Sequence, residues 1–477
     1  MTYKEIVESL IKFLIRPGGM GIGAGGPHLA RILARICGLG TVSAPGAEWI
    51  LAAKLQQGDK DYRDAVLAFP FKNTAKRILD TYYVEGGIEP GTPYKSLPML
   101  NFKPSQLDLE LIICGVFCAV WIAKQNCGDG QIAINFLKHI ELPMVYGLVG
   151  AMLAGVHQVT IGAGLADQVP DVLEALAAGK PIKYRIVAPG ASKGIQSRII
   201  EVNFDAADFF SSKLPEMIRP AFIPIVTLNV ALDILMNKTG GRIDAAAFEE
   251  AKRSGGHNPG PRGKKYSDDG QPIYTEKDRA DYVLAKKQGI PFWIGGGYSS
   301  PEGLALAQSS GAVGIQVASI FALSDDSELD PIYTALMRKL GYRGELEIRK
   351  DASVSPTFYP FMVPQLPGTM SDKNVYNSRP RICDLGALRQ PFVNAQGKII
   401  WRCPAERIAI YTHKGGLLED AVEKRCLCNN LLAAIRLANP GELPIFTLGS
   451  ELGFLTEIMD NEDDHYSATE AVNYLLS

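Results

Sequence analysis

The stretch PFWIGGGYSSPEGLALAQSSGAVGIQVASIF (Pro291–Phe321) decides the fold. An apolar run, Phe292–Ile294, leads into three consecutive glycines and then into an Ala- and Leu-rich segment that starts at Pro301. A second apolar run, Gly311–Val317, follows and ends in the small pair Ala-Ser. Apolar strands that alternate with helical segments in this way are typical of parallel β-α-β units.

The same alternation extends back through roughly the first 325 residues. The candidate strands are Gly40–Ser43, Gln131–Asn135, Gln158–Gly162, Lys183–Val187, Phe222–Thr227, Asp244–Phe248, Phe292–Ile294 and Gly311–Val317. Helical stretches between most of them are Pro27–Cys37, Pro143–Leu153, Asp171–Ala178, Asn229–Met236, Lys277–Lys287 and Pro301–Gln308. About eight such units in about 300 residues predict an α/β fold of the (β/α)8 TIM-barrel type, with a doubly wound open sheet as the alternative.

Two stretches break this rhythm. Residues 47–126 form a long insertion after an early strand, and residues 326–477 are rich in Pro, Arg and Cys without clear alternation. We therefore expect residues 1–325 to form the barrel, with the insertion inside that range. Residues 326–477 are expected to be a C-terminal extension packed on the barrel.

Composition narrows the class of protein. The chain has 477 residues, of which 47% are hydrophobic, and this is ample for a large core. Its 49 basic and 51 acidic residues leave a net charge of −2, which does not indicate a nucleic-acid binder. Eight cysteines in this length do not make a disulfide scaffold, so a cytoplasmic protein with reduced thiols is the simplest expectation.

Neither apolar segment that could be mistaken for a membrane element fits that role. Near the N-terminus, apolar residues recur at helical spacing from Ile6 to Leu14 with charges between them, which indicates an amphipathic helix and not a signal peptide. The apolar run Leu111–Ala123 is too short to span a bilayer and suits a buried helix. No membrane partner is expected.

The loops after the last two candidate strands have the composition of a phosphate site. Glycine permits close backbone approach, and helix N-termini present free N–H groups to anions. Phosphate sites in these barrels commonly follow strands seven and eight. Gly295–Gly297 and Ala318–Ser319 are therefore candidate donors to a ligand phosphate, whereas a single such loop would be read as an ordinary tight turn.

His257 is the candidate catalytic base. It lies in SGGHNPGPRG (Ser254–Gly263), after a candidate strand and therefore at the end of the barrel where active sites are found. Histidine titrates near neutral pH and can remove a proton. A lone histidine is more often structural than catalytic. Among the six histidines, however, only His257 lies in a glycine-flanked loop after a strand. His28, beside Pro27 at a helix start, is a weaker candidate.

The sequence offers two weaker signals. Gly18–Gly26 has glycine spacings that suggest a dinucleotide loop, but no clear hydrophobic strand precedes it, so a loop over a flat cofactor fits as well. Four cysteines near the C-terminus, Cys383, Cys403, Cys426 and Cys428, could hold zinc or an iron–sulfur cluster. Their spacing is unusual for zinc, so we expect buried thiols and no metal site.

Together these motifs resemble the nitronate monooxygenase (2-nitropropane dioxygenase) family, and most closely a longer bacterial branch with a C-terminal extension. The resemblance covers nearly the whole chain. It rests on GGMGIG (Gly18–Gly23), IAINFLKHI (Ile132–Ile140), GAMLAGVHQVTIGAG (Gly150–Gly164), SGGHNPGPRG (Ser254–Gly263), PFWIGGGYSSPEGL (Pro291–Leu304), GAVGIQVASIFAL (Gly311–Leu323), RPRICDLGALR (Arg379–Arg389) and KRCLCNNLL (Lys424–Leu432).

The resemblance implies an FMN-binding barrel and a role for each matching residue. His257 would be the catalytic base beside the flavin. The residues implied to bind the cofactor are Met20, Gly21, Asn135, Gly255, Gly256, Gly296, Gly297, Gln316, Ala318 and Ser319, the last five at the phosphate end. Two departures stand out: Ala318-Ser319 replaces the usual Gly-Thr, and FEEAKRSGGH replaces a shorter strand end in Glu-Gly. The second departure puts the orientation of His257 in question.

The resemblance also implies an activity. Family members oxidise alkyl nitronates, and in some cases nitroalkanes, with O2 to a carbonyl compound and nitrite. The same barrel, phosphate site and histidine would serve an NAD(P)H-dependent flavin reductase of the enoyl-thioester reductase type, and a flavin-binding protein of a biosynthetic cluster is a third reading. Family members are often homodimers. No feature of this sequence indicates the oligomeric state of the present protein.

Overall fold

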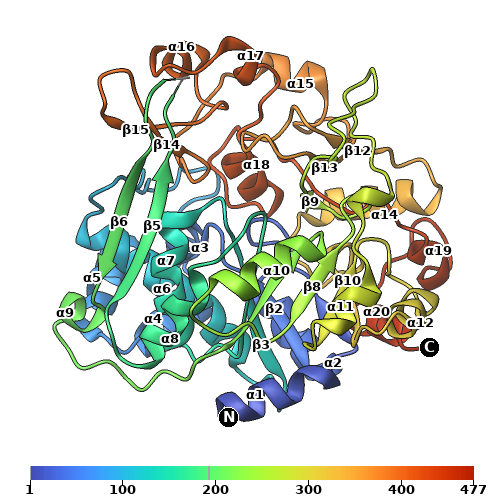
Figure 1. Ribbon diagram of the computed structural model, residues 1–477. Coiled ribbons are helices and arrows are strands. Elements are labelled where there is room, and N and C mark those ends of the chain that lie inside the picture. The colour runs from blue at the N-terminus through green and yellow to red at the C-terminus, as the bar shows by residue number, and fades with distance from the viewer. Residues whose placement is uncertain (1, 192–193) are drawn as a thin grey trace.

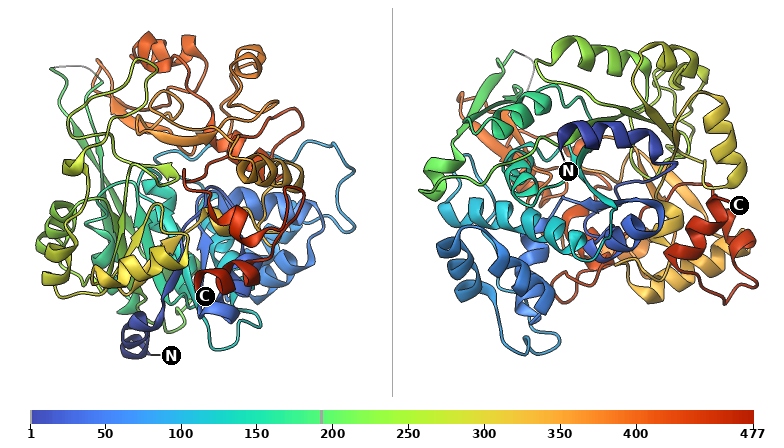
Figure 2. Two further views of the ribbon diagram at one scale, coloured as in Figure 1. Left: turned by 90° about the vertical axis from the view of Figure 1, so that its right-hand side faces the viewer. Right: turned by 90° about the horizontal axis from the view of Figure 1, so that it is seen from below.

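Eight parallel strands form the centre of the protein. The computed structural model describes residues 2–191 and 194–477. The strands follow the order β1-β11-β10-β8-β7-β4-β3-β2, and β1 and β2 at the two ends of this sheet lie against each other. The sheet is thus a nearly closed (β/α)8 barrel with helices around it, as the view from below in Figure 2 shows. The barrel is confirmed, and the open doubly wound sheet is excluded.

The barrel strands are short. They are β1 (Ile15–Pro17), β2 (Leu39–Ser43), β3 (Gln131–Leu137), β4 (Gln158–Gly162), β7 (Ala221–Val226), β8 (Ala246–Glu249), β10 (Phe292–Gly295) and β11 (Gly314–Val317). All but β1 overlap a candidate strand. They are buried almost throughout, because helices cover the barrel outside and side chains fill it inside.

One expected barrel strand lies elsewhere. Lys183–Val187 belongs to β5 (Ile182–Ala188), which pairs antiparallel with β6 (Arg198–Phe204) in a separate two-stranded sheet beside the barrel (Figure 1). Residues along β5 alternate strictly between buried and exposed. Such alternation belongs to a sheet with one solvated face, whereas a parallel barrel strand is buried on both faces. In the sequence, the charged residues Lys183 and Arg185 at alternate positions already indicated a strand with one exposed face.

The missing strand is β1, which follows the N-terminal helix α1 (Tyr3–Ser9) and the single 3-10 turn Leu10–Lys12. Its middle residue, Arg16, is completely buried inside the barrel. The guanidinium lies 5.1 Å from the Trp293 ring centroid and donates to Gln158 Oε1 at 2.6 Å. A three-residue strand that contains Arg and Pro does not have the composition by which strands are recognised.

The N-terminal segment closes the bottom of the barrel. Ile6, Leu10 and Phe13 pack against inward-facing residues of the strands, and Trp293 Nε1 donates to the Phe13 carbonyl at 2.6 Å. The helix predicted from the sequence is present but ends at Ser9, before the 3-10 turn, and Ile11 and Leu14 of the predicted apolar stripe are exposed. The buried residues of this segment serve as a plug. Figure 2 shows α1 lying across this end of the barrel.

Replacing Leu10 by alanine is expected to lower the free energy of unfolding by about 2–4 kcal/mol, because the side chain is fully buried and leaves a cavity. Urea unfolding followed by circular dichroism measures this change. Ile11→Ala is the matched control: Ile11 is 64% exposed, so its loss should change stability by less than about 0.5 kcal/mol. Equal effects of the two substitutions would contradict the plug.

Helices follow most of the strands and also make up the insertion. Those packed around the barrel include α2 (Pro27–Cys37), α7 (Glu141–Leu153), α8 (Val169–Ala177), α10 (Asn229–Lys238), α11 (Tyr282–Lys287), α12 (Pro301–Ser309) and α13 (Ser319–Ala322). The insertion holds α3 (Ala47–Gln56), α4 (Lys60–Ala68), α5 (Lys72–Tyr82) and α6 (Gln106–Lys124), and α9 (Ala206–Phe210) follows β6.

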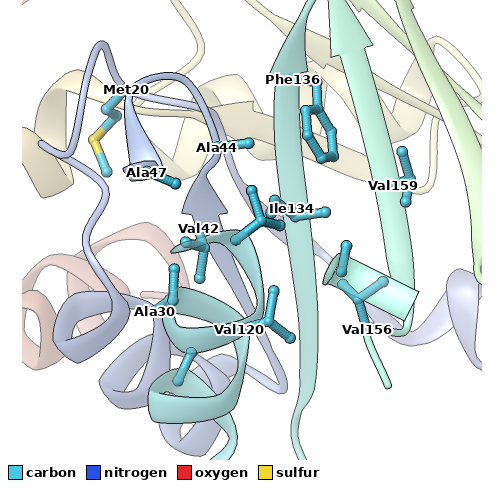
Figure 3. Packing of buried hydrophobic residues seen from close by; sticks show 14 of the residues in the cluster. Met20, Ala30, Val42, Ala44, Ala47, Val120, Ile134, Phe136, Val156 and Val159 are labelled. Carbon is cyan, nitrogen blue, oxygen red and sulfur yellow. The ribbon is translucent and has the colours of Figure 1, made fainter. Parts of the chain in front are cut away.

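Helix α6 contains the long apolar run. Among the described residues it is the one helix long and apolar enough to cross a membrane, but 78% of its apolar window is buried inside the fold. Figure 3 shows Val120 of this helix beside Val42 and Ile134 of strands β2 and β3, and all three belong to one core cluster. The burial and these contacts are those of a core helix, as expected from the sequence.

Much of the chain after about residue 326 covers the end of the barrel where the strands finish, whereas its last helix, α20 (Ala468–Leu475), packs on the side of the barrel against α2, α12 and α13. Helix α18 (Leu427–Ala434) lies above the barrel, as Figure 1 shows. The other elements here are β12 (Ile348–Asp351), β13 (Phe361–Pro364), β14 (Gln390–Val393), β15 (Ile399–Arg402), α14 (Pro331–Tyr342), α15 (Lys373–Ser378), α16 (Ile408–His413), α17 (Leu418–Ala421), α19 (Phe454–Ile458) and α20 (Ala468–Leu475). Strand β13 pairs with both β12 and the two-residue β9 (Gly256–His257), so this region is tied to the histidine loop.

Candidate active site

A large pocket lies between the strand ends and the C-terminal region that covers them. It is open to solvent on one side. Its floor comes from residues at or just after the ends of β1, β3, β4, β7, β8, β10 and β11. Active sites of this fold lie at this end of the barrel. The position is the one expected for a cofactor and its substrate.

The structure gathers nearly all of the predicted site residues in this one pocket. Gly21, Asn135, Gly255, Gly256, His257, Gly296, Gly297, Gln316, Ala318 and Ser319 all line it. Met20 does not: its side chain is buried in the core beside the loop. Its N–H donates to Ser43 Oγ, and its carbonyl accepts from the same hydroxyl, at 3.2 and 3.0 Å. Met20 thus fixes the shape of the loop, and its backbone is not free for a ligand.

Several pocket glycines occupy positions that no other residue could take without a clash. Gly296 and Gly297 have φ of +93° and +92°. A Cβ would lie 2.5 Å from Ser254 Oγ at the first position and 2.6 Å from Arg253 Cδ at the second. Gly256, with φ +66°, is different: a Cβ there would meet nothing within 4 Å and would extend into open space. The backbone leaves this space clear beside the histidine.

Asn135 is held at the end of β3. Its Oδ1 accepts from Thr160 Oγ1 at 3.1 Å, and a Cβ on Gly19 would lie 2.2 Å from its Nδ2. The glycine loop after β1 therefore packs directly on the amide. This contact explains why glycine is needed at position 19, and it keeps Asn135 at the pocket wall.

His257 is oriented by residues far away in the sequence. Its Nε2 is 2.7 Å from Ser355 Oγ, which is in turn 2.8 Å from Thr357 Oγ1. Strand β9 pairs His257 with Phe361, and their rings lie 4.6 Å apart between centroids. No hydrogen bond to Nδ1 occurs among the described residues. Because Nε2 is engaged, Nδ1 is the ring nitrogen left for a ligand.

A second histidine, missed by the sequence-based reading, lies beside the first. The ring of His139, which follows β3, is 6.4 Å from that of His257. Burial, and the nearby charge of His139, lower the pKa of His257 to about 3. Burial, and secondly Lys138, lower the pKa of His139 to about 4. Both imidazoles are therefore neutral at physiological pH.

The free energy of unfolding is expected to fall as the pH is lowered from 7 to 5. His257 stays neutral in the folded protein, whereas an unfolded histidine with a pKa of ~6.5 binds a proton in this range. The unfolded state then binds more protons, so the stabilisation present above pH 6.5 is lost toward the folded pKa of about 3. Urea titrations should show about 1–2 kcal/mol of this loss for His257. His257→Gln should flatten the dependence by that amount, and an unchanged slope would contradict the assignment.

The charged segment between the end of β8 and His257 is held by contacts of two neighbouring residues, Glu249 and Glu250. Burial raises the pKa of Glu249, which lines the pocket, to about 7. Lys350 of β12 lies close to it and donates to the carbonyls of Ala251 and, at 3.2 Å, Ser254. The Glu250 side chain is mostly buried, and its Oε1 accepts from Arg279, Tyr282 and Tyr298 at 2.8–3.0 Å. These contacts of the charged segment hold the loop that carries His257 in place.

Part of the pocket wall comes from the C-terminal region, and sequence reasoning missed this. Phe361, Leu388, Cys428, Leu431 and Thr447 line the pocket. Thr447 Oγ1 also accepts the Gly256 N–H at 2.7 Å. Ordinary apolar residues in an irregular segment carry no local signal of such a role, because the role depends only on where the chain returns.

Comparison with known proteins finds similar solved structures but no match by sequence. No protein-family model matches the chain, and no curated protein matches it. The structure is similar to FabK from Thermotoga maritima, with 14% identity, a TM-score of 0.46 and coverage of 99% of this chain and 94% of that one. It is also similar to a nitroalkane oxidase from Streptomyces ansochromogenes, with 12% identity, a TM-score of 0.45 and coverage of 98% and 96%.

The likeness is one of fold. A third similar structure, the enoyl reductase domain of MlnA from Bacillus amyloliquefaciens, has 11% identity and a TM-score of 0.37, and covers 77% of this chain and 66% of that one. Identities and scores this low carry no argument about chemistry. The function therefore has to be argued from the residues of the pocket.

Proposed function

We propose that this protein is a flavin-dependent oxidoreductase that binds FMN and oxidises alkyl nitronates with O2 to a carbonyl compound and nitrite. The observation that carries the proposal is the convergence of four glycine-containing loops, Asn135 and His257 on one pocket at the strand ends. A flat cofactor with a phosphate needs close backbone approach along its length, and glycine provides it.

The pocket fits the two ends of the cofactor differently. At the phosphate end, the loops after β10 and β11 would offer backbone N–H groups, and Ser319 would add its hydroxyl. Arg253 lies against Gly297 and would supply positive charge, while its guanidinium is 3.6 Å from Glu451. At the ring end, Gly256 lines the pocket, and a Cβ there would meet no protein atom within 4 Å. FMN bound there would accept electrons from the substrate and pass them to O2.

The state of His257 favours a substrate that arrives already deprotonated. A pKa of about 3 keeps the imidazole in its base form but gives it little driving force to remove a proton from a neutral nitroalkane. A nitronate anion needs no such step. Nδ1 would then position the substrate, while Ser355 holds the ring through Nε2. We therefore place nitronates ahead of nitroalkanes as substrates.

The first test is the absorbance spectrum of the purified protein, followed by mass identification of the released cofactor. FMN is expected in about one copy per chain. Anaerobic mixing then separates the activities, and we expect propionate 3-nitronate to bleach the flavin and NADPH to leave it oxidised. Rapid bleaching by NADPH would favour the enoyl-thioester reductase type instead. Bound FMN that responds to neither donor would indicate a binding protein, and a protein that cannot bind FMN would end the proposal.

A further inference from the structure

An apolar surface forms part of the pocket wall, and the glycine loops that would hold a flavin do not account for it. It consists of residues from the loop after β3, from β13, from the segment before β14 and from α18: Ile140, Phe361, Ala387, Leu388, Leu427 and Leu431. Four of them belong to one buried apolar cluster, against which the other two pack. Helix α18 lies above the barrel in Figure 1, so we call these six residues the apolar roof.

The apolar roof covers the part of the pocket beside His257. The ring of Phe361 is 4.6 Å from that of His257 between centroids. A Cβ built on Gly21 would lie 3.7 Å from Leu431 Cδ2, so the roof also packs on the glycine loop after β1. Because His257 is the group proposed to position the substrate, the substrate would lie under this apolar surface.

The charged carboxyl and amino side chains of the lining are all acidic. In the part of the chain that the structure describes, the pocket is lined by Glu249 and Glu451 and by neither lysine nor arginine. Glu451 belongs to the phosphate end, where its Oε1 is 3.6 Å from Arg253 Nε. Glu249 is the last residue of β8. A substrate that carries a carboxylate would therefore meet no cation in the lining.

Cations near the pocket lie outside its lining and already have partners. Lys350 donates to two backbone carbonyls of the loop before His257. Arg389, in the segment before β14, also donates to two backbone carbonyls. Lys138 pairs with Glu141. To pair with a carboxylate in the pocket, any of these cations would first have to give up its present contacts.

The nitronate group itself would be held by neutral donors. Ser355 Oγ accepts the Thr357 N–H at 3.2 Å, and when it donates its own hydrogen to His257 Nε2, the ring proton lies on Nδ1. This Nδ1–H can donate to a nitronate oxygen, and Asn135 offers its amide from the end of β3. The charge of a nitronate is spread over several atoms and is lost on oxidation. A carboxylate at the other end of the substrate would stay charged throughout.

We propose that the substrate is a nitronate with an uncharged aliphatic chain that lies against the apolar roof, and that Leu388, Leu427 and Leu431 set this preference. The inference rests on the proposed flavin-dependent oxidation. Burial of an aliphatic chain under the roof is favourable, whereas a carboxylate there would lose its hydration without gaining a cation. Specificity then comes as much from the rejection of a charged chain as from the attraction of an apolar one. Propionate 3-nitronate would still reduce the flavin, with a lower kcat/KM.

The experiment compares two nitronates of the same size on the purified holoprotein, with initial rates of nitrite release expressed per bound flavin. Propionate 3-nitronate has a carboxylate where 3-methylbutane 1-nitronate has an isopropyl group. We expect kcat/KM to be at least ~10-fold higher for the second. Across the unbranched nitronates of ethane, propane and butane it should rise about 3-fold for each added CH2.

The outcomes separate the inference from the proposed function. Equal kcat/KM values for the matched pair, or a preference for propionate 3-nitronate, would overturn the inference and leave flavin-dependent nitronate oxidation intact. If neither nitronate reduces the flavin, the proposed function fails and the inference fails with it.

A measurement without turnover separates binding from chemistry. The carbon acids of the same pair are 3-nitropropionate and 3-methyl-1-nitrobutane, and either one changes the flavin absorbance when it binds beside the ring. Dissociation constants from anaerobic titrations should favour the uncharged compound at least ~10-fold. The reverse order would overturn the inference whichever step limits turnover.

A charge placed at the roof tests which residues set the preference. Leu431→Arg should shift the ratio of kcat/KM values toward propionate 3-nitronate at least ~10-fold, because the guanidinium would stand close to the carboxylate. Leu417→Arg is the matched control: Leu417 is 58% exposed and does not line the pocket, so the same charge there should leave the ratio unchanged. A Leu431→Arg protein that binds flavin and keeps the wild-type ratio would remove the roof from the explanation. If this variant does not fold, the comparison of the two nitronates on the wild type still decides.

Discussion

A protein in which leucine replaces Gly256 is expected to fold and to bind no flavin. The Gly256 φ of +66° makes any side chain there cost about 1–2 kcal/mol, but a Cβ meets no protein atom within 4 Å. The leucine side chain would therefore extend into the pocket, where the cofactor is proposed to lie. Flavin content after purification, and titration of the apoprotein with FMN, should show affinity lowered at least ~100-fold.

Gly270 provides the control for this substitution. It has a φ of +81°, has no atom within 4 Å of a built Cβ, and lies in a surface turn away from the pocket. Gly270→Leu therefore carries the same backbone strain, and it should cost similar stability but retain full flavin binding. If Gly256→Leu binds FMN as the wild type does, the cofactor does not lie against this loop.

The second large effect is expected at His257. Removal of a proton by a positioned base contributes about 10²–10⁴ in rate, and the low pKa of His257 places its contribution at the lower end, so His257→Asn should lower turnover of a neutral nitroalkane by about 100-fold. A nitronate arrives deprotonated, so its turnover should fall less than ~10-fold, through poorer positioning alone. Initial rates of nitrite release on matched pairs of nitroalkane and nitronate measure both effects. Equal losses on the two substrates would leave His257 a positioning role only.

His157 is the control for this experiment. It is also a buried histidine, and burial lowers its pKa to about 4, but it does not line the pocket. Its Nδ1 accepts the N–H of Ile132 at 2.9 Å, a bond that an asparagine can imitate. His157→Asn should therefore change neither the rates nor their ratio. A drop in nitroalkane turnover in this variant would mean that the effect at His257 is not specific.

Local patterns along the chain were enough to predict the barrel and most of the floor of the pocket. Alternating apolar runs and helical segments report which faces are buried, and parallel strands place their following loops at one end. The glycines after β10, the pair Ala318-Ser319 after β11 and the loop of His257 could therefore be assigned to one site. The prediction failed at one strand: Lys183–Val187 was expected in the barrel, but the eighth barrel strand is β1. A three-residue strand has too few positions to show a hydrophobic period, so it could not be recognised from the sequence.

Contacts between distant segments could not be predicted in this way. The partner of His257 at Ser355 and the neighbouring His139 depend on where distant parts of the chain meet. The low pKa of His257 likewise follows from burial under the C-terminal region and not from any neighbour in sequence. The sequence alone predicted most of the candidate residues for the chemistry, because residue type and local period are local properties. Only the tertiary structure decided which nitrogen of His257 is free and which charges stand together, because burial and proximity are properties of the folded chain.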